Sequence, residues 1–221
     1  MATEERNIKG VDEVRFIGPG DLHVAQGDHE LLTVHAPGYL IDHIQSEVVD
    51  GCLHLGYRNR AVPLLRAQRE TFRFTLQLRD FHGITVCGSG EVTAPDLDND
   101  YLRVTIDGSG NVRLSNLTAD RLETVITGCG SVFVAGDVEE QDLTVAGSGA
   151  YDSTGLIGDF GRVKLTGSGR ANVAVSDDLD VLITGSGVVN YAGSPTVTKQ
   201  IYGSGKLGRI RSRVPESRDV R

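Results

Sequence analysis

A glycine-rich tripeptide, Gly-Ser-Gly in six copies and Gly-Cys-Gly in one, recurs seven times at nearly fixed spacing in this chain of 221 residues. The first glycines of successive copies are 20, 20, 19, 20, 18 and 18 residues apart. A fixed period of this size is the signature of a protein built from stacked repeats. We therefore expect these glycines to be structural turn residues: Gly88, Gly90, Gly108, Gly110, Gly128, Gly130, Gly147, Gly149, Gly167, Gly169, Gly185, Gly187, Gly203 and Gly205.

Apolar residues occupy alternate positions on both sides of each tripeptide. An alternation with a period of two residues is typical of β-strands and not of helices. Glycine adopts backbone angles that a side chain would forbid, so the tripeptide suits a tight corner. Each repeat is thus predicted to be a strand, a corner, a second strand and a polar turn. The position two residues before the first glycine is aliphatic in every copy: Val86, Ile106, Ile126, Val145, Leu165, Ile183 and Ile201.

A single repeat is too small to bury its own apolar face, whereas stacked repeats close a continuous core and pair their backbone groups. The sequence therefore predicts an all-β fold, a parallel β-helix or solenoid of about seven regular coils. In the last copy, Lys199 and Arg209 replace apolar residues of the repeat. Such polar intrusion is expected of a terminal coil.

The first 80 residues have the composition of strands but a less regular pattern. We interpret them as degenerate coils that begin and cap the solenoid, within one domain spanning residues 1–221. Residues 81–208 then form the regular part, and residues 209–221 form a basic tail with five arginines. The strands expected in the N-terminal part lie within 14–27 (interrupted by Gly18-Pro-Gly20) and at 31–36, 44–49, 52–57 and 71–78.

Composition narrows the function classes. The net charge of −8 argues against non-specific binding to nucleic acid. No apolar run is long enough to span a membrane. The N-terminus lacks the features of a secretory signal, so we expect a cytoplasmic protein from the sequence as given, or a cell-envelope protein had a leader been removed. Three cysteines without metal-ligand spacing indicate neither a disulfide framework nor a zinc site.

Three segments resemble one bacterial family. They are residues 16–27 with Gly20-Asp-Leu, residues 47–56 with Asp50-Gly-Cys-Leu, and the units of the type Ile106-Asp-Gly-Ser-Gly-Asn-Val112. The chain resembles the head GIN domain family, described as "putative autotransporter adhesins" of unknown function, over residues 10 to 210. The resemblance implies a right-handed parallel β-helix, an adhesion-type role and, in many members, a secretion or lipoprotein leader.

No residue pattern points to catalysis. The serines of the tripeptides recur in almost every copy, whereas a catalytic serine is a single residue beside a base. The tripeptides lack the helix of a dinucleotide site and the Gly-Lys-Ser/Thr of a phosphate loop, so no cofactor is expected. Adjacent carboxylates such as Glu139 and Glu140 would face opposite sides of a strand. We therefore expect no catalytic residue and no enzyme.

An acidic residue lies twelve positions after the first glycine in several copies. If coils stack in register, these carboxylates share one edge, where Arg103, Arg121 and Arg162 are near in sequence. A solvated polar turn explains the pattern, and a weak cation-binding edge is the alternative. The candidates are Asp100, Asp120, Glu140 and Asp159, with Asp178 one residue off register.

These observations favour a non-catalytic binding or adhesion module whose partner is a glycan or a protein. The first alternative is an intracellular scaffold that associates end to end as a homo-oligomer. The second alternative is a polysaccharide-active enzyme, because β-helices also carry such activities. Neither a nucleic-acid partner nor a membrane span is expected.

Overall fold

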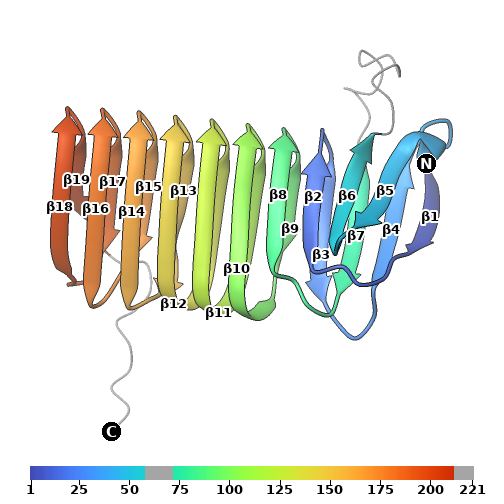
Figure 1. Ribbon diagram of the computed structural model, residues 1–221, viewed down its shortest axis with the longest axis horizontal. Coiled ribbons are helices and arrows are strands. Elements are labelled where there is room, and N and C mark those ends of the chain that lie inside the picture. Colours follow the sequence, from blue (N-terminus) through green and yellow to red (C-terminus); the bar gives the residue numbers. More distant parts are fainter. Residues whose placement is uncertain (58–71, 212–221) are drawn as a thin grey trace, which may run out of the picture.

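The computed structural model describes residues 1–57 and 72–211, and its strands form a β-solenoid of about six turns, against the seven coils expected (Figure 1). Two layers of strands face each other along its length. The strands that lead into the tripeptides form what we call the front sheet, and those that follow them form the back sheet. Pairing between successive coils is parallel throughout the regular part, as the repeat pattern predicts.

The regular coils run from β8 to β19 in chain order. The front sheet contains β8 (Gly83–Gly88), β10 (Leu97–Gly108), the C-terminal parts of β11 (Asn111–Gly128) and β12 (Ser131–Gly147), β14 (Phe160–Gly167), β16 (Asp178–Gly185) and β18 (Thr196–Gly203). The back sheet contains β9 (Glu91–Ala94), the N-terminal parts of β11 and β12, β13 (Ala150–Ile157), β15 (Arg170–Ala174), β17 (Val188–Ala192) and β19 (Lys206–Arg209).

The N-terminal part continues both sheets, but out of chain order. Strands β2 (Glu13–Ile17) and β3 (Asp21–Gln26) pair in parallel with β8 and β9 and so form one further coil. Strands β6 (Cys52–Tyr57) and β7 (Arg73–Leu78) pair with β2 and β3 on the other side. The part expected to hold degenerate coils therefore contains two coil-like strand pairs.

Antiparallel strands end the two sheets beyond these coils. Strand β5 (Ile44–Val49) pairs with β6, β4 (Leu31–Ala36) pairs with β7, and β1 (Ala2–Asn7) pairs with β4. A 3-10 helix, η1 (Ile41–His43), precedes β5. The strands expected at 31–36, 44–49 and 52–57 are confirmed at these bounds, and the one expected at 71–78 is β7.

One cluster of buried apolar side chains extends from Ile8 to Val189 between the two sheets. Its columns follow the repeat, since Ile106, Ile126 and Val145 are paired in successive coils and are all fully buried. Lys199 and Arg209 of the terminal coil are exposed beside Val181 and Tyr191, as the polar intrusion predicted. Among the described residues, no helix has the length and apolar character needed to cross a bilayer.

Two glycines of one tripeptide show why the corner excludes other residues. Gly128 has a φ of +122°, and a Cβ built on it would lie 2.5 Å from the carbonyl oxygen of Gly108 in the preceding coil. That oxygen accepts a hydrogen bond from the Cys129 amide at 2.9 Å, so the close approach is part of the ladder between coils. A Cβ on Gly130 would lie 2.5 Å from the Gly110 oxygen and 2.6 Å from Ile106 Cγ2.

A buried polar cluster interrupts the aliphatic core in the middle of the solenoid. The Gln141 side-chain amide donates to the Ala174 carbonyl oxygen at 2.8 Å. Its side-chain oxygen accepts from the Ser153 hydroxyl at 2.8 Å and the Tyr151 hydroxyl at 3.3 Å. Burial raises the pKa of Tyr151 well above its ordinary value, so the phenol stays a donor. The amide therefore ties three strands together inside the core.

Candidate binding face on the front sheet

The outer face of the front sheet carries two parallel columns of side chains, which are polar or charged except for one phenylalanine. Residues of one strand alternate between core and surface, so the surface positions of stacked strands align. The first column contains Tyr101, Arg121, Glu140, Phe160, Asp178 and Thr196. The second contains Arg103, Glu123, Asp142, Arg162, Asp180 and Thr198.

The register corrects one expectation about the acidic residues. The pairing of β11 with β12 shifts between Leu114 and Leu117, because this coil is one residue shorter than the preceding one. Glu140 therefore pairs with Arg121 and does not share a column with Asp120. Asp178 pairs with Phe160, in the same column as Glu140.

The remaining acidic candidates lie at the turn beside the first column. Asp100 and Asp120 each directly precede paired residues, Tyr101 and Arg121, and both are exposed. The Asp159 amide donates to the Glu139 carbonyl oxygen at 3.2 Å, which places Glu139 where Glu140 was expected. Within residues 1–57 and 72–211, no three His, Cys, Asp or Glu side chains converge into a group that could hold a metal ion. The cation-binding edge stays a prediction.

Ion pairs link the two columns across several coils. Arg121 contacts the carboxylates of Glu140, at 3.0 Å, and Asp142. Arg162 contacts Asp142 at 3.0 Å and Glu140 at 3.8 Å, so two guanidinium groups share two carboxylates. All four side chains remain partly exposed, which limits the stabilisation that each pair contributes. The network instead holds donors and acceptors in fixed positions on the surface.

A second group occupies the neighbouring coils. The Tyr101 hydroxyl donates to Glu123 Oε2 at 2.6 Å, and the Arg103 guanidinium donates to the same oxygen at 2.8 Å. The hydrogen bond from Tyr101, assisted by Arg103, lowers the pKa of Glu123 below its ordinary value. Burial and the hydrogen bond to Glu123 raise the pKa of Tyr101. This group is a neutral phenol on a firmly ionised carboxylate.

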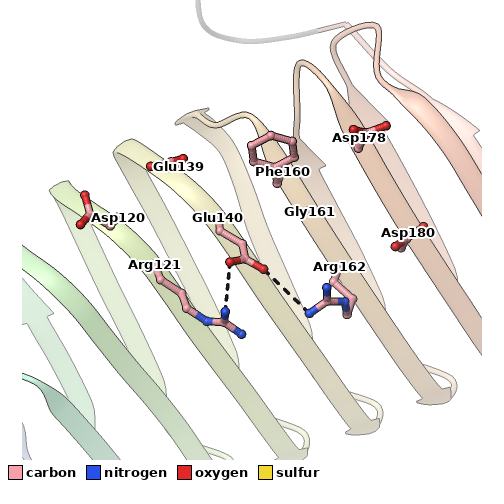
Figure 2. A pocket seen from close by; sticks show the side chains of 9 residues that line it. All are labelled: Asp120, Arg121, Glu139, Glu140, Phe160, Gly161, Arg162, Asp178 and Asp180. Atoms are coloured by element: carbon pink, nitrogen blue, oxygen red, sulfur yellow. Dashed lines mark hydrogen bonds and ion pairs between the residues drawn. The ribbon is translucent and has the colours of Figure 1, made fainter.

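A shallow hollow of about 460 Å³ lies over the ion pairs (Figure 2). One lining residue is aromatic: Phe160, which is 40 % exposed. Among the charged lining residues, five carry carboxylates and two carry guanidinium groups. In Figure 2 the ring of Phe160 lies between Glu140 on one side and Asp178 on the other. The lining residues are Asp120, Arg121, Glu139, Glu140, Phe160, Gly161, Arg162, Asp178 and Asp180.

The aromatic ring of this hollow was not expected from the sequence. Phe160 interrupts a column that is otherwise polar, and a large apolar residue at an outward position of the repeat is the signal that identifies it. The three cysteines Cys52, Cys87 and Cys129 are free thiols, and none of them lines the hollow. Cys129 is exposed at the corner, in the position that serine takes in the other copies.

Comparison with solved structures shows the same fold in other bacterial proteins. A protein from Bacteroides fragilis described as a "putative adhesin" aligns with a TM-score of 0.84 and 23 % identity, over 95 % of this chain and 96 % of that one. One from Parabacteroides distasonis described as a "putative lipid binding protein" has a TM-score of 0.78 and 22 % identity over the same shares. A "putative adhesin" from Parabacteroides merdae has a TM-score of 0.75 and 20 % identity, again over 95 % and 96 %.

The comparison with curated proteins finds no match. The family model described as "Putative auto-transporter adhesin, head GIN domain" matches residues 11–195, which includes the N-terminal coils and most of the regular ones. The resemblance expected from the sequence is thereby confirmed. The chain therefore belongs to the head GIN domain family of adhesin-type β-solenoids.

Proposed function

We propose that this protein is a non-catalytic adhesion-type module that binds a glycan in the hollow of the front sheet. Membership of an adhesin-type family supports the adhesion-type role. The observation that supports glycan binding is the partly exposed Phe160 ring beside a fixed set of carboxylates and guanidinium groups. An aromatic ring set among fixed polar groups combines an apolar contact surface with hydrogen-bonding partners for a ligand.

The chemistry of the hollow suits a sugar. A pyranose presents hydroxyls that both donate and accept hydrogen bonds, together with an apolar C–H face. Carboxylates such as Asp178 accept, and the guanidinium of Arg162 donates, so each hydroxyl finds a complementary group. The Phe160 ring offers a flat apolar surface for the C–H face. The volume of about 460 Å³ lies within the range of about 300–1,000 Å³ typical of small-ligand pockets.

The excess of carboxylates sets the expected charge of the ligand. Five acidic side chains against two arginines give the hollow a negative potential, which repels anionic sugars. A neutral or amino-bearing glycan is therefore favoured over a sulfated or uronic-acid polymer. Binding by contact alone requires no chemical change of the sugar, in keeping with a non-enzyme.

A glycan array with the purified chain tests the proposal. The wild-type protein is expected to bind neutral or amino-bearing glycans, and Phe160→Ala to lose that binding at least about tenfold. Ile17→Ala is the matched control, because Ile17 is 41 % exposed and lies outside the hollow. Asp178→Asn removes one acceptor charge at nearly constant shape and is expected to weaken the same glycans.

Three results would contradict the proposed glycan site or its non-catalytic role. Equal binding by wild type and Phe160→Ala would show that the hollow is not the contact. Binding only to anionic glycans would contradict the electrostatic argument. Release of shorter sugars from a bound polysaccharide would contradict the non-catalytic role.

A further inference from the structure

Both sheets of the solenoid are open at both ends. In the part of the chain that the structure describes, β5 pairs only with β6 and β1 only with β4, at the N-terminal end. At the other end, β18 pairs only with β16 and β19 only with β17 (Figure 1). A strand with one partner presents unpaired backbone donors and acceptors along its free side. Within residues 1–57 and 72–211, the solenoid therefore has two pairs of free edges.

Exposed apolar side chains gather at these ends. Of the nine large hydrophobic residues that are exposed among the described residues, six lie in or beside the terminal strands. Ile201 belongs to the core column of Ile183 and is 36 % exposed because no further coil covers it. The side of the solenoid carries only the other three. The six are Met1, Tyr39, Val48, Val49, Ile201 and Tyr202.

The described strands at the two ends carry opposite net charge. Residues 196–211, which include β18 and β19, contain Lys199, Lys206, Arg209 and Arg211 and no acidic residue. Strands β1 and β5 together contain three glutamates and one arginine, Arg6, which pairs with Glu4 at 3.0 Å within β1. Like ends therefore repel each other, and only unlike ends attract.

We propose that the C-terminal strands β18 and β19 dock onto the N-terminal strands β5 and β1 of a second copy of this chain. The pairings within the molecule fix the strand directions at such a junction. For two copies in the same orientation, β18 meets β5 antiparallel and β19 meets β1 parallel, and both are allowed ladders. The contact joins different surfaces of the two copies, so it generates an open chain of molecules and not a closed dimer.

The charged residues in the terminal core columns set the strength of the junction. Lys199 and Arg209 take positions that are apolar in the preceding coils, and basic side chains at a sheet edge oppose indiscriminate pairing. Glu5 and Glu47 lie on the outward side of β1 and β5, opposite to the core-facing side from which Lys199 and Arg209 extend, so their attraction for the basic side chains acts across the edge and not through direct ion pairs. Association is consequently expected to depend on concentration and to weaken with salt.

Sedimentation velocity of the full chain tests this proposal. The wild type is expected to gain weight-average mass as its concentration rises through about two decades at low salt, with an affinity about tenfold weaker at high salt. Lys199→Glu/Lys206→Glu/Arg209→Glu changes the net charge of residues 196–211 from +4 to −2, and Glu5→Lys/Glu47→Lys changes that of β1 and β5 together from −2 to +2. Each variant alone is expected to remain monomeric.

Sedimentation velocity of the two variants mixed together is the decisive measurement. The acidic C-terminal end of the first variant faces the basic N-terminal end of the second, so mixing restores one junction and yields heterodimers. Lys164→Glu, on the exposed side of β14, is the control and is expected to associate like the wild type.

Either of two results overturns the proposal. A wild-type chain that stays monomeric at the highest concentration shows that the two ends do not dock onto each other. Association that both charge-reversed variants retain unchanged places the contact elsewhere on the molecule. The proposal is independent of glycan binding, because no residue of the hollow lies in β1, β5, β18 or β19.

Discussion

Replacing glycines by alanine separates two reasons why the corners of the solenoid require glycine. Gly128→Ala faces both: its φ of +122° is unfavourable for a side chain, and its Cβ meets the Gly108 oxygen at 2.5 Å. Gly10 has a positive φ of +66° with nothing within 4 Å of a Cβ, so Gly10→Ala measures strain alone. A Cβ at Gly130 meets the Gly110 oxygen at 2.5 Å without a positive φ, so Gly130→Ala measures contact alone. Gly38→Ala has neither problem, since its nearest atom is at 3.9 Å.

The expected losses follow from the two terms. Strain of a side chain at positive φ costs about 1–3 kcal/mol, and overpacking against fixed atoms costs about 1–3 kcal/mol. Gly128→Ala is therefore expected to lose about 4 kcal/mol, and Gly10→Ala and Gly130→Ala about 2 kcal/mol each. For a chain of this size, 1 kcal/mol corresponds to about 2–4 °C in Tm. The Tm is thus expected to fall by roughly 8–16 °C for Gly128→Ala and by roughly half of that for Gly10→Ala and Gly130→Ala.

Thermal unfolding followed by circular dichroism, with urea unfolding as a second measure, provides the readout. Gly38→Ala is expected to unfold within about 2 °C of the wild type, because it adds neither strain nor contact. The reasoning fails if Gly128→Ala unfolds within the error of Gly38→Ala. It fails in part if Gly128→Ala equals Gly10→Ala, because the close approach between coils would then contribute nothing.

Three further predictions concern the core and the front sheet. Gln141→Ala leaves three buried hydrogen-bonding groups without their partner and is expected to lower the free energy of unfolding in urea by at least about 3 kcal/mol. Tyr151→Phe removes one hydroxyl and is expected to lower it by about 1 kcal/mol. Equal losses for the two variants would contradict the network. The pKa of Glu123 is lowered in the folded state, so its stabilisation is present above the unfolded pKa of about 4.5 and is lost as the pH falls through and below that value. Wild type is therefore expected to lose more stability between pH 7 and pH 3 than Glu123→Gln, and parallel urea midpoints for the two would refute this. Calcium is expected to leave the Tm unchanged, because Glu140 binds Arg121 and does not join the column of Asp120, and a rise in Tm would restore the cation-binding edge.

The repeat made the architecture predictable because local and stacking preferences agree in it. Aliphatic residues at alternate positions favour a strand with one buried face, and glycine at each corner fixes where that strand ends. The paired, buried column of Ile106, Ile126 and Val145 follows from these two preferences. The N-terminal order was not predictable in this way. Strands β6 and β7 lie outside β2 and β3 because long-range pairing decides their place, and no local signal in 52–57 or 73–78 records the partner.

The register of the acidic residues was predictable, but only from the correct end of the coil. Counted forward from the preceding glycine, Glu140 aligns with Asp120; counted back from the following glycine, Glu139 does. The structure follows the second count, because the glycine corners of successive coils pair with each other and fix the strand that leads into them. The hollow around Phe160 could not be derived, because its shape depends on the rotamers of side chains from four coils.

The shifted pairing between Leu114 and Leu117 shows where the solenoid accommodates differences in coil length. The missing residue is absorbed at the corner near Gly136, opposite the glycine tripeptides, and the ladder resumes without disturbing the buried columns. A loss or gain of one residue at such a corner therefore changes which surface side chains become neighbours while the interior stays the same. Proteins with this fold can therefore acquire new combinations of surface side chains without any change in the packing of the core. Coil length is the property to compare between members of the family that bind different ligands.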